Sequence, residues 1–253
     1  MARLSSGNRI NSASDDAAGV AIASRLTADI RGTDQAIRNA LDGQALLDTA
    51  EGAHKEIENI LQRMREVSVQ AGNDTNNQQD RDNLQAELNA LSAEIDRIAG
   101  TTTWAGADLM EDATTTFSFQ VGAATGTQNQ IAVTIKTMNA TGLAVGTGSV
   151  STIDVETSGA TANAGTALID AAIEDVNIQR SELGAVSNRL NHTVNNLTNI
   201  SSNLSAAKGG IEDADFALET TNLAKNQILQ QASTAMLAQA NASKQNVLSL
   251  LQG

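Results

Sequence analysis

Few residues in this chain are suited to acid–base or nucleophilic chemistry. It contains two histidines, His54 and His192, and no cysteine, so disulfides and thiolate metal sites are excluded. A helical zinc-protease site requires the pattern H-E-x-x-H, and His54-Lys55-Glu56 does not fit it. We expect His54 to lie on a helix face near solvent, without a catalytic role.

Neighbouring carboxylates are the other candidates for proton transfer. Asp15-Asp16 and Glu212-Asp213 stand where we expect helices to begin. The partial positive charge of a helix N-terminus favours acidic residues there, and this explains the pairs better than catalysis does. No glycine-rich phosphate loop follows a predicted strand, and no aromatic residues alternate with the basic ones. The sequence predicts no enzyme active site, no cofactor and no metal.

The net charge and the hydropathy of the chain limit the kinds of partner that it can bind. The net charge is −13 and the isoelectric point is about 4.4, so the surface repels nucleic acid and anionic lipid. The sequence contains no run of 18 apolar residues, so we expect no transmembrane helix. The first residues, MARLSSGNRINSASDD, contain no apolar segment typical of a signal peptide. If the protein leaves the cell, we expect export without a cleaved signal.

The composition favours long helices over a globular core. Proline, the strongest helix breaker, is absent from all 253 residues, and aromatic residues make up only 2%. Burial must therefore come from Ala, Leu, Ile and Val, which pack well where helices approach closely along a seam.

Apolar residues of the first half recur in alternating steps of three and four. The stripe runs from Ala50 to Ala71, and Gly72-Asn73-Asp74 predicts its end. An earlier helix is predicted from about Asp15 to Leu47, with Asp15 or Asp16 as its cap. A further stripe, capped by Asp80 or a neighbour and ending at Gly100, comprises Leu84, Leu88, Leu91, Ile95 and Ile98.

The middle of the chain changes character. Residues 101–165 are rich in Thr, Gly, Ala and Ser. Two alternating segments, 116–121 and 130–135, flank a turn-like stretch and predict a β-hairpin. The rest of this region is expected to be loop, with one further short strand at Thr152–Val155.

The second half returns to helical periodicity. A stripe from Leu168 to Ile211 covers ~44 residues, or ~65 Å of helix, and Gly209-Gly210 is expected to interrupt it. A last amphipathic stretch follows. Because the N-terminal stripes have no other apolar surface of equal length, the two ends of the chain must pack together. The predicted fold is mainly α: a long antiparallel helical rod or coiled-coil bundle with a small β-hairpin insertion.

At both ends the sequence resembles bacterial flagellin. RLSSGNRINSASDDAAGVAIASRL is similar to the N-terminal signature of that family, and LQAELNALSAEIDRIAGTTTWAGADLM to a following segment. SNLSAAKGGIEDADFALETTNLAKNQILQQASTAMLAQANASKQNVLSLLQG resembles its C-terminus. The resemblance covers residues 3–110 and 166–253. It implies a structural subunit of the flagellar filament that self-assembles through long helices for motility, outside the cell.

The resemblance also implies a division of the chain. It gives a spoke segment at 1–14, rod helices at 15–110, a β-hairpin and variable segment at 111–165, a rod helix at 166–209 and a filament-core helix at 210–253. Flagellins begin with one more helix, whereas Met1-Ala2 directly precedes Arg3 here. The large outer domains of longer flagellins are also missing. We therefore expect an N-terminally truncated, short flagellin that forms no long filament alone.

Two surfaces are implied by the resemblance. Within LQRMREVSVQA, Arg63 is the leading residue for contact between protofilaments and with the flagellin-sensing Toll-like receptor, supported by Glu66, Val67 and Glu87. A solvated helix face with an Arg63–Glu66 pair is the alternative. The assembly face, which an export chaperone is also expected to bind, comprises Phe216, Leu223, Ile228, Leu229, Met236, Leu237, Leu248 and Leu251.

Other partners follow from the same resemblance: further flagellin subunits, the flagellar type III export apparatus, and the filament cap and hook-associated proteins. Two alternative functions stay open at this point. One is a secreted or cell-surface binding module, such as an adhesin, built on the same rod. The other is a hook-associated junction protein, which needs larger inserted domains.

Overall fold

The computed structural model describes the backbone of residues 2–111, 114–145 and 148–251. The chain forms two compact units. One unit comprises residues 32–199 and holds most of the core; the other comprises residues 1–31 together with 200–253. The mainly helical fold predicted from the sequence is confirmed.

Helix α2 (Ala17–Ala71) is one continuous helix of 55 residues. The two N-terminal segments predicted separately are therefore joined, because nothing between them breaks the helix. Its first turn is capped by Asp16, whose Oδ1 accepts a hydrogen bond from the Gly19 amide at 2.9 Å. Helix α3 (Gln78–Thr101) begins at the N-cap Asn77, and Asp80 completes a capping box.

Helix α4 (Gly159–Glu212) is longer than predicted at its start. Ser158 and Thr161 exchange hydrogen bonds between side chain and backbone at 3.2 and 3.1 Å, which begins the helix before the apolar stripe. The predicted interruption at Gly209-Gly210 is wrong, because the helix continues through both glycines. Each glycine costs only ~1 kcal/mol relative to alanine in a helix, and the amide of Asp213 still bonds to the Gly209 carbonyl at 2.8 Å.

In the part of the chain that the structure describes, the strands form three separate antiparallel pairs. In the predicted hairpin, β3 (Thr115–Gln120) pairs with β4 (Gln130–Ile135), with Phe117 opposite Val133. The other pairs are β1 (Thr103–Trp104) with β2 (Ala107–Asp108) and β5 (Ala144–Val145) with β6 (Gly148–Ser149).

The short strand predicted at Thr152–Val155 is wrong. Its first residue closes the 3₁₀ turn η2 (Val150–Thr152), and the remaining residues form no strand. Gln85 of α3 holds this segment instead, accepting from the Val155 amide at 2.9 Å and donating to the Ile153 carbonyl at 3.0 Å. A second 3₁₀ turn, η1 (Thr127–Asn129), lies in the loop between β3 and β4.

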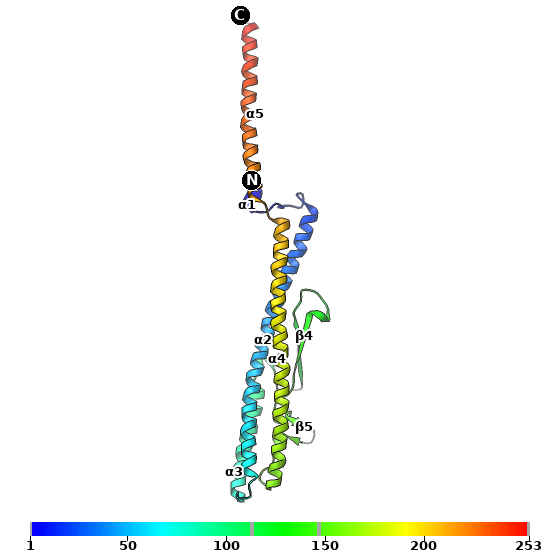
Figure 1. Cartoon of the computed structure of the whole chain (residues 1–253), viewed down its shortest axis with the longest axis vertical. Coiled ribbons are helices and arrows are strands. Elements are labelled where there is room, and N and C mark those ends of the chain that lie inside the picture. The colour runs from blue at the N-terminus through cyan, green and yellow to red at the C-terminus, as the bar shows by residue number, and fades with distance from the viewer. Residues whose placement is uncertain (1, 112–113, 146–147, 252–253) are drawn as a thin grey trace. The chain divides into compact units, whose positions relative to one another are not determined.

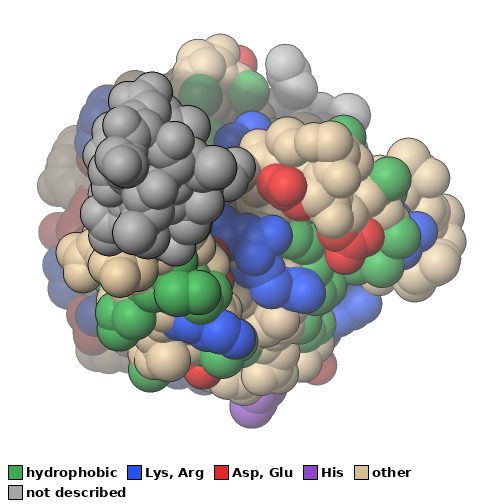
Figure 2. Space-filling view, turned by 90° about the horizontal axis from the view of Figure 1, so that it is seen from above, with side chains coloured by type: hydrophobic (Ala, Val, Ile, Leu, Met, Phe, Trp, Pro, Cys, Tyr) green, Lys and Arg blue, Asp and Glu red, His purple; other side chains and the backbone are tan. Residues whose placement is uncertain are grey.

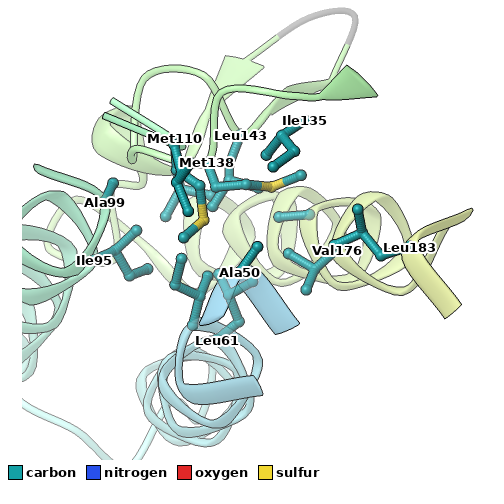
Figure 3. Packing of buried hydrophobic residues seen from close by; sticks show 14 of the residues in the cluster. Ala50, Leu61, Ile95, Ala99, Met110, Ile135, Met138, Leu143, Val176 and Leu183 are labelled. Atoms are coloured by element: carbon teal, nitrogen blue, oxygen red, sulfur yellow. The ribbon is translucent and has the colours of Figure 1, made fainter. Parts of the chain in front are cut away.

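The core of the 32–199 unit lies where α2, α3, α4 and the hairpin region meet (Figures 1 and 3). Figure 3 shows Leu61, Ile95 and Val176 directed from three helices toward Met110 and Met138. All five are at most 1% exposed. The stripes of the two chain halves thus pack against each other, as the periodicity predicted.

Uncharged side chains also join elements that are far apart in the chain. Gln179 of α4 is fully buried, donates to the Thr134 carbonyl at 3.0 Å and accepts from the Lys136 amide at 3.4 Å. Ser68 of α2 donates to the Ala162 carbonyl at 2.8 Å. The Gln179 contacts satisfy backbone groups of the hairpin segment in the interior.

In the unit formed by the two ends of the chain, the short helix α1 (Ala2–Ser6) contacts α5 (Phe216–Leu251). Asn8 pairs with Asp213 in an antiparallel bridge. The predicted filament-core segment therefore starts its helix at Phe216, later than residue 210.

The predicted placement of Glu212-Asp213 at a helix start is also wrong. Glu212 is the last residue of α4. The cap of α5 is Asp215, which accepts from the Ala217 and Leu218 amides at 2.9 and 3.2 Å.

Candidate interaction surfaces

Arg63, Glu66 and Glu87 form an exposed ionic cluster on α2 and α3. The Arg63 Nε and Nη2 atoms donate to Glu87 Oε1 at 3.0 and 2.7 Å, and Nη1 donates to Glu66 Oε2 at 3.0 Å. These hydrogen bonds, with Glu87 the stronger contributor, raise the pKa of Arg63 above its ordinary value. The side chains stay 50%, 69% and 39% exposed, so the cluster presents a fixed guanidinium to solvent.

Val67 does not belong to that surface. Its side chain is 0% exposed and packs in the core with Met64. Val67 lies on the apolar stripe from Ala50 to Ala71, which predicts burial, and this prediction is confirmed. Val67 can therefore influence the Arg63 cluster only by supporting α2 from beneath.

Two further arginines link α2 to α4. Arg65 Nε donates to Asp170 Oδ1 at 2.5 Å. Arg180 donates to Glu51 at 2.8 and 2.9 Å and also to Glu58, and hydrogen bonding to Glu51 is the largest cause that raises its pKa. Sequence reasoning missed both links, because neither partner lies close to its arginine in the chain.

The expectation that His54 lies near solvent is wrong: its side chain is 0% exposed. Nδ1 lies 2.6 Å from the Ala50 carbonyl oxygen, and Nε2 has no hydrogen-bond partner among the described residues. Because a carbonyl only accepts, Nδ1 carries the proton and Nε2 is bare. Burial is the largest cause that lowers the pKa of His54, and the positive charge of Arg180 adds to it.

The signal for burial was present in the sequence. His54 stands four residues after Ala50 and three before Ile57, within the same stripe of steps of three and four. At this position the place on the stripe, and not the polar residue type, determines burial.

Helix α5 presents large apolar side chains to solvent. Phe216 is 56% exposed, Ile228 65%, Leu229 52%, Met236 74% and Leu237 64%. Leu223 is half-buried. Leu248 and Leu251 lie outside the side chains that the structure describes.

The apolar residues of α5 are not confined to one narrow stripe. At ~100° per residue, Phe216, Leu229 and Ile228 point in widely different directions around the helix. Leu218, also 62% exposed, extends the set and was missed by the prediction. Residues 226–243 carry no charge. A helix apolar on several sides is typical of one surrounded by other protein.

Figure 2 shows hydrophobic side chains on this face of the molecule, with Lys and Arg side chains beside them. Within the described residues, no helix is both long and apolar enough to cross a membrane. Nor does that part of the chain bring together three or more His, Asp or Glu side chains able to hold a metal ion.

Comparison with known families finds a match for each end of the chain. Residues 1–115 match the bacterial flagellin N-terminal helical region, and residues 166–251 match the bacterial flagellin C-terminal helical region. This chain belongs to the bacterial flagellin family. The family is a structural one, whose members assemble into the extracellular filament of the flagellum. Nothing in these comparisons favours the adhesin alternative.

Flagellins of other bacteria match over the full chain. A flagellin of Halalkalibacterium halodurans is 45% identical over 252 residues, covering 100% of this chain and 90% of the relative. A flagellin of Bacillus subtilis is 44% identical over 280 residues, covering 100% of this chain and 91% of the relative. A short flagellin without a large variable domain fits both matches.

Solved structures agree on the fold. The crystal structure of Bacillus cereus flagellin is 34% identical, with a TM-score of 0.52 over 68% of this chain and 94% of that one. A putative flagellar hook-associated protein from Vibrio parahaemolyticus reaches a TM-score of 0.66 over 79% of this chain and 100% of that one. At 17% identity, this second match shows a shared fold alone.

Proposed function

We propose that this flagellin packs into the filament chiefly through α5. The observation that carries the proposal is the exposure of large apolar side chains around this helix, together with the uncharged stretch 226–243. Burying one leucine contributes ~1.5–3 kcal/mol, so several such residues supply a strong drive for association. The same surface would be bound by an export chaperone before assembly, because an uncovered apolar helix invites aggregation.

The proposal is tested by sedimentation velocity of the purified chain over a concentration series. We expect concentration-dependent association that Leu229→Gln weakens at least about tenfold, since a buried leucine side chain is lost. Gln230→Asn, a polar change at the next position of the same helix, is the matched control and should leave association unchanged. Equal association of the wild type and Leu229→Gln, or a wild type that stays monomeric throughout, would refute the role of α5.

The exposed ionic cluster is proposed as a second contact surface. Arg63, with Glu66 and Glu87 holding its guanidinium, would contact neighbouring protofilaments and the flagellin-sensing Toll-like receptor. Arginine is frequent at interface hot spots because its planar donors can bind two acceptors at once. Val67 is not proposed as a contact residue, because it is buried.

A receptor-reporter assay tests this second surface. We expect Arg63→Ala to reduce activation while leaving the helix content, measured by circular dichroism, unchanged. Arg97→Ala is the matched control, because Arg97 also forms an exposed ion pair three residues along its helix, with Glu94 at 2.6 Å. Activation by Arg63→Ala equal to that of the control would remove Arg63 from the receptor surface.

We infer the remaining partners from family membership. The chain would leave the cell through the flagellar type III export apparatus, without a cleaved signal peptide, and would meet the filament cap and hook-associated proteins at the ends of the filament. We propose no catalytic role, since the sequence offers two histidines and no cysteine.

A further inference from the structure

The methionines of this chain differ sharply in exposure. Met64, Met110 and Met138 are each 1% exposed, whereas Met236 is 74% exposed. Figure 3 shows Met110 and Met138 enclosed by neighbouring apolar side chains. Oxidation of a thioether by peroxide requires contact between the sulfur atom and the oxidant, and its rate follows exposure.

The sequence around Met236 explains its exposure. One turn away on either side, at i±3 and i±4, stand Ala232, Ser233, Gln239 and Ala240. Three of these side chains are too small to cover a thioether, and side chains three and four residues apart are the ones that meet on a helix. Both Met236 and its neighbours lie in the uncharged stretch 226–243, and the Met236 side chain lies on the outside of the helix.

We propose that Met236 is a site of reversible oxidation that controls the association of the free subunit. Peroxide transfers one oxygen atom to the Met236 sulfur, giving methionine sulfoxide and water; the sulfur is oxidised and the peroxide O–O bond is broken. The product is a polar group in place of an apolar one. Its effect on association rests on the proposed role of α5, because burying an unpaired polar group opposes packing.

Because oxidation requires access to the Met236 sulfur atom, we expect assembly to protect Met236 from oxidation. Once α5 is covered by other subunits, Met236 should become as inaccessible as the three core methionines. Oxidation would then act on subunits before association and spare those already assembled. A sulfoxide reductase would restore the thioether, with two thiols oxidised to a disulfide and the sulfoxide oxygen released as water, and with it the ability to associate.

The first measurement is peptide mapping by mass spectrometry after treatment of the folded chain with hydrogen peroxide. We expect Met236 to oxidise on the order of tenfold faster or more than Met64, Met110 and Met138, as their exposures require. Unfolding in denaturant should make the four rates similar. Similar rates in the folded chain would overturn the proposal directly.

The second measurement separates this proposal from the proposed role of α5. Sedimentation velocity should show weaker association for the peroxide-treated wild type, and no such loss for treated Met236→Leu, which keeps an apolar side chain without sulfur. Loss of association in both treated proteins would assign the effect to another residue and overturn the proposal. Leu229→Gln tests α5 without any oxidation: if it associates normally, the role of α5 fails, whatever the oxidation rates are.

Discussion

Buried His54 makes the stability of the 32–199 unit dependent on pH in a defined window. In the folded chain Nδ1–H is engaged by the Ala50 carbonyl, and Nε2 faces no acceptor. Protonating Nε2 would place a positive charge in the interior, close to the Arg180 guanidinium and only partly offset by Glu51. The folded pKa is therefore lowered from the ordinary value of 6.5, chiefly by burial.

The sign of the effect follows from proton binding. Below pH 6.5 the unfolded chain takes up a proton at His54 and the folded chain resists it, so the unfolded state gains free energy. The stability that neutral His54 contributes is fully present above pH 6.5 and is lost as pH falls toward the folded pKa. The loss approaches ~1.4 kcal/mol per pH unit within that window.

Urea denaturation followed by circular dichroism at pH values from 7 down to 5 measures the effect. His54→Gln removes the titration while its amide can still donate to the Ala50 carbonyl, so its stability should depend less on pH over this range. His192→Gln, which changes the exposed histidine, should keep the wild-type dependence. Parallel pH profiles of the wild type and His54→Gln would refute the reasoning.

Glu94 does not contribute to the pH dependence of stability in this window. The pKa of Glu94 is lowered, with a hydrogen bond from the Arg97 guanidinium as the largest cause. Its contribution is present above its ordinary pKa of 4.5 and is lost only as pH falls further. The part of the fall between pH 6.5 and 5 that His54→Gln removes therefore reports on His54.

Three further changes test the packing. Leu190→Ala, at a fully buried position of α4, should lower the free energy of unfolding by ~2–5 kcal/mol in urea denaturation, through lost contacts and a cavity. Gln179→Met should cost ~1–3 kcal/mol by leaving the Thr134 carbonyl and Lys136 amide unpaired, and a neutral result would show that water replaces both bonds. Ala105 has a φ of +50° in the two-residue turn between β1 and β2, so Ala105→Asn should raise the melting temperature, because asparagine adopts that backbone at a lower cost than alanine.

The sequence predicted the helices well because the same residues that favour helix also form the seam. The stripe from Ala50 to Ala71 identified most of the buried face of α2, although it left out His54, Leu61 and Ser68. The predicted hairpin strands lie within one residue of the observed ones. The hydrophobic steps carry this information directly, since an uncovered stripe of that length has to find a partner.

What the sequence did not predict depends on contacts between distant residues. Nothing near Arg180 in the chain identifies Glu51 and Glu58 as its partners, 129 and 122 residues away. The end of α4 was misplaced because Gly209-Gly210 is a local signal for a break that the helix tolerates. Which exposed residues bind other molecules depends on partners that no intramolecular pattern specifies.

The amide and hydroxyl contacts of Gln85, Gln179 and Ser68 affect how the fold responds to the salt concentration around a filament. Dissolved ions screen interactions between exposed charges over ~8–10 Å at ordinary salt concentrations, but they have little effect on hydrogen bonds between neutral groups. The hairpin and the 153–155 segment are therefore attached to the rod by links that neither brine nor fresh water weakens. By contrast, the exposed ion pairs of Arg63 and Arg65 weaken as the ionic strength rises. Both pairs lie at the surface.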